Sequence, residues 1–258
     1  MGKKKLLEEI LLEHDMLKRK RFETFLWMGD QHVPYQDVKT NKMVLKFCKD
    51  LKPDTIILGG DVMDFYSVSS YDKDPSRANK LQKEIDKGIK YLEKVRSASS
   101  NSKIMYLEGN HENRLERYLK RHPELWDIKA LKIPSLLELT ELDIKYKQHY
   151  LHKNFLFKHG DYCNKYSSNK ELEVEGINGM SGHSHRNQMF SKNTRAGYLA
   201  WYTVGHLSDE KMADYIKGIP NWQQGIAVIH FKKNSKRYHV TQLPIVKNKL
   251  VYEGEEYK

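Results

Sequence analysis

The stretch Leu58-Gly59-Gly60-Asp61-Val62-Met63-Asp64 decides the fold of this 258-residue chain. The residues from Thr55 to Leu58 are apolar or β-branched, and they end abruptly at two glycines and a carboxylate. This pattern predicts a buried strand that presents Asp61 at its C-terminal end, where the glycines allow the backbone to turn sharply.

Other apolar runs end in the same way, with glycine next to Asp, Asn or His. The segments at which they end are Gly29-Asp30-Gln31-His32, Gly109-Asn110-His111-Glu112, His159-Gly160-Asp161 and Gly182-His183-Ser184-His185. Carboxylate, amide and imidazole side chains are ligands for hard and borderline divalent metals. The sequence therefore predicts that these strand ends converge with Asp61 on one site for two metal ions.

The alternation of apolar and amphipathic stretches predicts a mixed α/β fold. Strands expected over residues 22–28, 55–58 and 104–107 alternate with helices over 37–51 and 77–98, which is typical of parallel strands with helices outside. Short β segments follow, over 144–149, 154–158, 177–182, 198–203, 225–231, 238–243 and 249–252. This organisation predicts two sheets packed face to face, with helices outside.

We expect one domain over residues 22–258, preceded by a basic amphipathic helix over 1–21. The basic cluster Lys18-Arg19-Lys20-Arg21 closes that helix. Such a helix either contacts phosphates or packs on the sheet edge with a solvated basic rim. A helical insertion is expected over about 113–140, beside the site, and it carries Arg114, Arg117, Lys120 and Arg121.

The composition narrows the class of protein. The mean hydropathy is -0.77, and no apolar stretch is long enough to span a bilayer. The two cysteines, Cys48 and Cys163, form no CxxC motif, so we expect a cytoplasmic protein in a reducing compartment. The formal net charge of +11 fits a polyanionic partner such as DNA or RNA. The excess is spread along the chain, so a lysine-rich solvated surface explains it equally well.

Taken together, these segments form an ordered set that seldom arises by chance. At these residues the sequence resembles the calcineurin-like metallophosphoesterase superfamily, with all five signature blocks in the family's order, across roughly residues 22 to 232. The resemblance implies a four-layer α/β/β/α sandwich of two mixed sheets flanked by helices. It also implies hydrolysis of phosphate esters at a dinuclear metal site.

The resemblance implies a role for each matching residue. Asp30, His32 and His185 would bind one ion, Asn110, His159 and His183 the other, and Asp61 would bridge them. His111 would stand beside the substrate phosphate without binding metal, Glu112 would orient His111, and Asp64 would support the site from behind. Arg114 would contact the phosphate, as in the phosphoprotein phosphatase branch. A helix-surface arginine is the alternative. No Arg-Gly follows Asp64 as it does in that branch, which argues against phosphoprotein hydrolysis.

The chemistry suits these residue types. Two divalent ions about 4 Å apart can share a hydroxide and hold a phosphoryl group for in-line attack. A bridging carboxylate maintains that spacing, because its two oxygens can each take one metal. We expect manganese first, with iron, zinc or nickel as alternatives. A histidine with a pKa near neutral, such as His111, can protonate the leaving group.

Several readings of the substrate and of other residues stay open. We expect a phosphodiesterase or nuclease acting on nucleic acid or a nucleotide, with a phosphomonoesterase such as a phosphoprotein phosphatase as the alternative. A catalytically inactive scaffold and a nucleic-acid-binding module are the competing classes. His206 either lines the pocket or is an ordinary capped histidine. Trp126, Trp201 and Trp222 either stack on bases or pack in the core or an interface.

Overall fold

The computed structural model describes residues 11, 21–73, 80–210 and 219–258. The helix predicted over 1–21 therefore lies, apart from positions 11 and 21, outside the described residues. The first three residues of the helix predicted from residue 77 also lie outside them.

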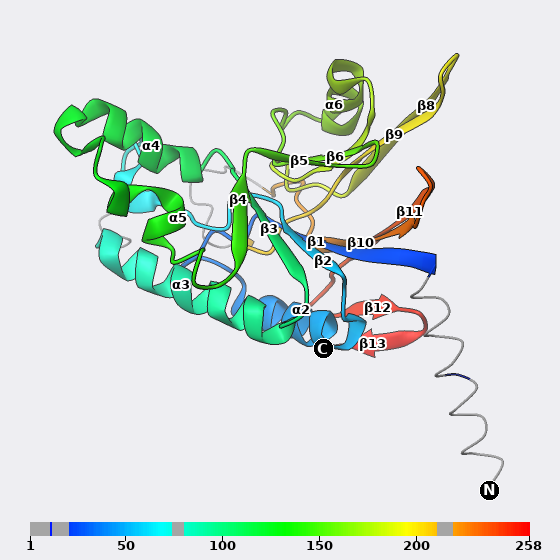
Figure 1. Ribbon diagram of the computed structural model, residues 1–258, viewed down its shortest axis with the longest axis horizontal. Helices are drawn as coiled ribbons and strands as arrows, with labels where there is room; N and C mark the ends of the chain where they lie inside the picture. Colours follow the sequence, from blue (N-terminus) through cyan, green and yellow to red (C-terminus); the bar gives the residue numbers. More distant parts are fainter. Residues whose placement is uncertain (1–10, 12–20, 74–79, 211–218) are drawn as a thin grey trace, which may run out of the picture.

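The larger sheet has six strands in the order β11-β10-β1-β2-β3-β4. Strands β1 (Phe22–Met28), β2 (Thr55–Leu58), β3 (Lys103–Leu107) and β4 (Ile144–Lys147) are parallel. Strand β10 (Gly225–Lys232) pairs antiparallel with β1 and with β11 (Tyr238–Pro244). Helices α2 (Val38–Leu51) and α3 (Leu81–Ala98) cover its outer face (Figure 1). Parallel neighbours place the carboxyl ends of β1, β2 and β3 at one edge of this sheet.

The smaller sheet has five strands in the order β5-β6-β7-β9-β8. Its strands are β5 (His149–His152), β6 (Phe155–Lys158), β7 (Asn178–Ser181), β8 (Gln188–Thr194) and β9 (Gly197–Thr203). Helix α6 (Ser167–Glu175) packs on its outer face through Leu172, which lies in one cluster with Leu156 and Trp201. A hairpin of β12 (Leu250–Tyr252) and β13 (Glu255–Tyr257) follows the last long strand. The predicted four-layer α/β/β/α sandwich is confirmed.

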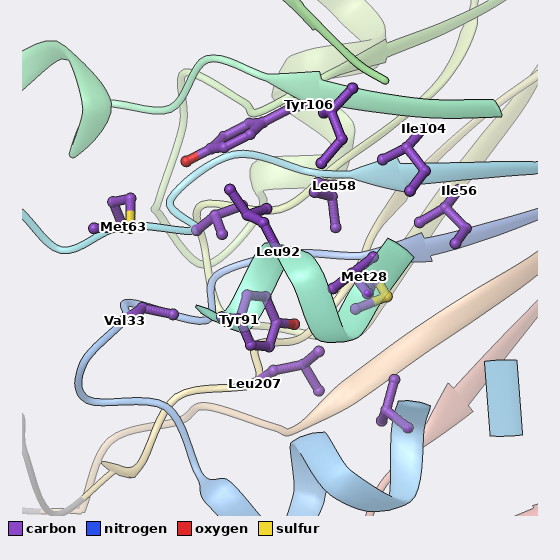
Figure 2. Packing of buried hydrophobic residues seen from close by; sticks show 14 of the residues in the cluster. Met28, Val33, Ile56, Leu58, Met63, Tyr91, Leu92, Ile104, Tyr106 and Leu207 are labelled. Atoms are coloured by element: carbon purple, nitrogen blue, oxygen red, sulfur yellow. The ribbon is translucent and has the colours of Figure 1, made fainter. Parts of the chain in front are cut away.

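Strand β1 shows how the sequence builds these layers. Alternate side chains of a strand point to opposite faces. Phe25 and Trp27 accordingly join the aromatic core between the two sheets, while Leu26 and Met28 join the core under the helices. Figure 2 shows side chains of β1 and β2, such as Met28 and Ile56, facing Leu92 of α3. From Phe25 to Met28 the strand is buried on both faces, and every residue of that stretch is apolar.

The connection between β3 and β4 is helical, as the sequence predicts for residues 113–140. It consists of α4 (Glu112–Arg121), two single 3₁₀ turns (Pro123–Leu125 and Lys129–Leu131) and the short helix α5 (Ile133–Leu136). Helix α4 begins directly after His111, so the side chains of its first turn lie beside the strand ends.

The second half of the chain departs from the prediction in places. The segment expected as one strand over 144–149 is two strands, because the chain leaves the larger sheet after Lys147 and enters the smaller sheet at His149. Helix α6 and strands β8 and β13 carry no strong signal in the sequence. Strand β8, with the sequence QMFSKNT, lies at a sheet edge and has no continuous apolar face.

Glu84 of α3 is a buried carboxyl whose environment favours the neutral form. Its Oε1 accepts a hydrogen bond from the Ser67 N–H at 3.3 Å, and its Oε2 has no partner among the described residues. Burial, together with the negative charge of Asp64, raises the pKa of Glu84 from 4.5 to about 7.

We predict that Glu84→Gln stabilises the fold at pH 8 and not at pH 4. In the unfolded chain the carboxyl ionises near pH 4.5, whereas in the folded chain it ionises near 7, so wild-type stability falls as pH rises through this window. The Glu84→Gln variant does not ionise and keeps this stability. The difference in unfolding free energy at pH 8 is at most about 3 kcal/mol. Urea unfolding of both proteins at the two pH values, in the presence of a chelator, measures it. Equal stability at pH 8 would contradict the burial argument.

Candidate metal centre

Side chains from both sheets meet at the carboxyl ends of the strands. Asp30 and His32 follow β1, and His185 follows β7. The His185 Nε2 lies 3.3 Å from the Asp30 Oδ1 and 3.2 Å from the His32 Nε2. These three residues offer ligand atoms within 4.8 Å of one another, and all three are buried. The first predicted metal group is therefore assembled in the structure.

A second group lies on the other side of Asp61. His159 directly follows β6. Its Nε2 is 3.2 Å from the Asp61 Oδ2 and 3.0 Å from the Asn110 Oδ1. His183 completes the group, with its ring centroid 5.0 Å from that of His159. The His159 Nδ1 lies 2.9 Å from the Gly59 carbonyl oxygen, an acceptor that fixes the ring and leaves Nε2 free for a ligand role.

Asp61 lies between the two groups, but its two oxygens have different surroundings. Its Oδ1 accepts the backbone N–H of His111 at 2.8 Å. Its Oδ2 lies 3.2 Å from the His159 Nε2 and 3.9 Å from the His32 Nε2, so this one oxygen faces both groups. The sequence led us to expect one oxygen for each metal. In the structure Oδ2 faces both groups, whereas Oδ1 is occupied by the His111 N–H.

The backbone around the site adopts a conformation that most residues avoid. Positive φ angles between 49° and 63° occur at Asp30, His32, Asp61, His183 and His185. Such left-handed conformations in non-glycine residues require a surrounding structure that enforces them, and they concentrate at functional sites. Five of the seven predicted metal ligands have this conformation, which nine other non-glycine residues of the described chain also adopt.

The glycines of the motifs are needed for close approach as well as for turning. A Cβ at Gly109 would lie 2.2 Å from the Asp61 Oδ1, and one at Gly182 would lie 2.2 Å from the Asp30 Oδ2. Any side chain at these positions would displace a carboxylate from the centre. Gly60, in contrast, does have a positive φ of 86°, in line with the turn expected there.

The predicted catalytic residue His111 lies at the edge of the first group. Its Nδ1 is 3.1 Å from the Asp64 carbonyl oxygen and 3.4 Å from the Asp64 Oδ2. Arg114 donates from Nη2 to the His111 Nε2 at 2.9 Å, and from Nη1 to the Asp64 Oδ1 at 3.0 Å. With Nε2 as the acceptor, the proton of the neutral ring resides on Nδ1 and faces Asp64. Arg114 is thus part of the site and not a surface arginine.

Glu112 does not orient His111, contrary to the expectation. Its Oε2 accepts the N–H groups of Asp61 at 2.9 Å and Gly109 at 2.8 Å. Its Oε1 accepts the Met63 N–H at 3.0 Å and the Tyr106 hydroxyl at 2.7 Å. Glu112 is fully buried and ties the loops after β2 and β3 together from below. The partner that orients His111 is Asp64.

Electrostatics favour the ligand forms of the acids and of His185. Burial opposes ionisation of Asp61, but the positive charge of His111, His159 and His32 outweighs it and holds the pKa of Asp61 well below its ordinary value. Burial lowers the pKa of the His185 imidazole to about 3, against the opposing pull of Asp30. His185 is therefore neutral at physiological pH, which is the protonation state of an imidazole that binds a metal.

The donor set fits two borderline divalent ions. Each group combines imidazole nitrogen with carboxylate oxygen and contains no thiolate, which suits Mn, Fe, Zn or Ni. A bound cation can satisfy the buried carboxylates and imidazole nitrogens at these separations. His111 also falls in a group with His32 and Asp61, so proximity alone does not separate it from the ligands.

Comparison with known proteins agrees with the geometry. The sequence profile of the calcineurin-like phosphoesterase family matches residues 23–218. The chain belongs to this family. It is therefore a metal-dependent hydrolase of phosphoric esters. No helix among the described residues is long and apolar enough to cross a membrane.

Two phage proteins and several solved structures are similar to this chain. The Gene 54 protein of Mycobacterium phage L5 is 26% identical over 223 residues, covering 78% of this chain and 86% of that protein. The Gene 54 protein of Mycobacterium phage D29 is 26% identical over 255 residues, with coverages of 90% and 97%. Vacuolar protein sorting 29 from Cryptosporidium parvum is 11% identical, with a TM-score of 0.48 and coverages of 92% and 95%. A Vps29 variant from Entamoeba histolytica is also 11% identical, with a TM-score of 0.47 and coverages of 91% and 99%.

Other residues singled out in the sequence have varied positions. Trp201 is fully buried, and its indole N–H donates to the Ser181 hydroxyl at 3.0 Å, so it is a core residue. Trp126 is 38% exposed on the helical connection. His206 is fully buried, and its ring contacts that of His185. The Trp222 ring also contacts His185. Asp64, expected from the sequence to support the site from behind, lies beside the His111 ring and the Arg114 guanidinium.

We predict that Asp61→Ala abolishes turnover and lowers metal occupancy at both groups, because the Oδ2 of Asp61 faces both. His111→Ala should reduce turnover by about 10²-fold or more while both ions stay bound. Elemental analysis after dialysis against Mn²⁺, alongside phosphatase assays, measures both effects. Loss of an ion in His111→Ala would make His111 a ligand.

We predict that Asp64→Asn chiefly lowers activity and that Glu112→Gln chiefly lowers stability. Asp64→Asn removes the charge beside His111 and Arg114, so activity should fall at least tenfold with little change in stability. Glu112→Gln places an amide among four donors, so stability should fall by about 2–4 kcal/mol. Activity assays and urea unfolding separate the two. An unchanged stability in Glu112→Gln would contradict this structural role and favour the catalytic role that the sequence led us to expect for Glu112.

Proposed function

We propose that this protein is a two-metal phosphodiesterase that acts on nucleic acid or on a nucleotide. The arrangement that carries the proposal is the pair of ligand groups that share the Asp61 Oδ2, with His111 and Arg114 beside them. When bound, two divalent ions, manganese first, would activate water and offset the charge of the phosphoryl group.

The residues around the centre then have distinct tasks. Asp30, His32 and His185 hold one ion, Asn110, His159 and His183 hold the other, and Asp61 spans them. Arg114, with its planar fork, binds a non-bridging phosphate oxygen. Once Arg114 donates to the phosphate, the His111 Nε2 is free to carry the proton that the leaving oxygen needs. Asp64 holds the Nδ1 side of that ring and favours its charged form.

The surface next to the centre supports a polyanionic substrate. The Arg117 guanidinium donates to the Asn110 carbonyl oxygen at 3.4 Å. Arg121 and Lys120, which is paired with Glu116 at 2.7 Å, continue along α4 away from the metals. Beyond them the Lys132 ammonium lies 3.7 Å from the centre of the Trp126 ring. Basic side chains interleaved with an exposed aromatic ring suit a single strand, whose phosphates and bases they can bind.

A phosphomonoesterase, such as a phosphoprotein phosphatase, is the second candidate. A cavity of about 460 Å³ beside Asn110 and His159 has Glu108, Asp161 and Glu175 in its wall. The one lysine there, Lys158, is already paired, lying 2.7 Å from the Glu175 Oε1. Carboxylates in excess repel a second phosphate, which favours a small monoester whose organic group donates hydrogen bonds.

We predict hydrolysis of bis(p-nitrophenyl) phosphate at a rate well above that of p-nitrophenyl phosphate, with Mn²⁺ present and with Asp61→Ala as the inactive control. Single-stranded DNA should be cut, and its affinity should fall steeply with salt because bound phosphates release counterions. A tenfold preference for the monoester, with DNA left intact, would select the phosphomonoesterase. No Mn²⁺-dependent hydrolysis of either ester would reject both candidates.

A further inference from the structure

Two imidazoles of the centre, those of His159 and His185, are held in different ways. The His159 ring has a hydrogen-bond acceptor behind it, the Gly59 carbonyl oxygen at 2.9 Å. The His185 Nε2 faces Asp30 and His32, but its Nδ1 is buried and has no hydrogen-bond partner among the described residues. An acceptor behind a ligating imidazole normally fixes its orientation. His185 needs another means of support.

Two aromatic rings surround His185 instead. The His206 ring stacks on it, with the centroids 4.8 Å apart and the planes inclined by 26°. The Trp222 ring contacts His185 edge to face, with the centroids 4.4 Å apart and the ring planes inclined by 69°. The Trp222 and His206 rings also contact each other, with their centroids 5.7 Å apart. Contacts of this geometry restrict rotation of an imidazole about its side-chain bonds.

The stacked histidine is itself held firmly. His206 is fully buried, and its Nδ1 lies 2.8 Å from the Ser208 hydroxyl. Its backbone N–H donates to the Gln223 carbonyl oxygen at 3.1 Å, while the Gln223 N–H donates to the His185 carbonyl oxygen at 2.8 Å. The three rings therefore come from segments whose backbones are bonded to one another, and His206 can act as a fixed platform.

We propose that His206 and Trp222 are positioning residues that set the orientation of His185 and, through it, the affinity of the ion held by Asp30, His32 and His185. The proposal rests on the two-metal function proposed above. It assigns a task to a buried histidine that neither ligates the ions nor reaches the substrate. It also explains how a ligand without an acceptor on Nδ1 keeps its Nε2 directed at the centre.

Two substitutions of His206 separate stacking from hydrogen bonding. His206→Phe keeps a planar ring and loses the bond to Ser208, whereas His206→Gln keeps a polar group near Ser208 and loses the ring. We expect His206→Gln to weaken one of the two Mn²⁺ sites by about 10–100-fold, and His206→Phe to stay within about threefold of wild type. Trp222→Ala should act like His206→Gln, and Trp222→Phe like His206→Phe.

The measurement is Mn²⁺ binding by chelator competition on the full chain, with stoichiometry from elemental analysis. His152→Ala is the matched control, because the His152 ring packs tilted against Phe25, with the centroids 4.7 Å apart, and its loss should leave both Mn²⁺ affinities unchanged. Circular dichroism confirms folding of each variant, and Trp222→Ala supplies the test if His206→Gln does not fold.

The outcomes separate the two proposals. If the wild type binds two Mn²⁺ ions, and His206→Gln and Trp222→Ala bind both with wild-type affinity, the positioning role is wrong and the two-metal function stands. Weakened Mn²⁺ binding in His206→Phe, with wild-type affinity in His206→Gln, would assign the effect to the bond with Ser208 and would also overturn the stacking role. If the wild type binds fewer than two ions, the two-metal function itself fails.

Discussion

The buried carboxylate of Asp61 is the feature on which the rest of the centre depends. A charge removed from water needs partners, and Asp61 has them on every side. Its Oδ1 receives the His111 N–H and its Oδ2 lies 3.2 Å from the His159 Nε2. Its own N–H donates to Glu112, which also accepts the Gly109 N–H from the loop after β3. One anion thus determines where the loops after β2 and β3 sit relative to β6.

The sequence predicted the layers and the membership of the site because both depend on local signals. Apolar runs of β-branched and aromatic residues mark the buried strands, and the glycines with Asp, Asn or His mark their ends. Parallel strands bring those ends to one edge without any knowledge of loop structure. Strand β1 illustrates the point, since its alternation alone assigns Phe25 and Leu26 to different cores.

The contacts that the sequence did not predict are those set by loop geometry. Glu112 is adjacent to His111 in the chain, yet its carboxylate points below the loops, and Asp64 reaches His111 instead. The left-handed φ of Asp30 and Asp61 has no signature in residue type, because the surrounding fold imposes it. Strand β8 and helix α6 were missed for a related reason. Their residues are largely polar, and only their neighbours make them regular.

Both ligand groups draw on both halves of the sandwich. Asp30 and His32 come from the larger sheet and His185 from the smaller one, while Asn110 and His159 are divided in the same way. Ions bound here act as cross-links between two layers that are otherwise joined by an apolar interface. Any sliding of one layer over the other would alter both coordination spheres at once. Ion binding and docking of the layers are therefore thermodynamically linked, and each strengthens the other.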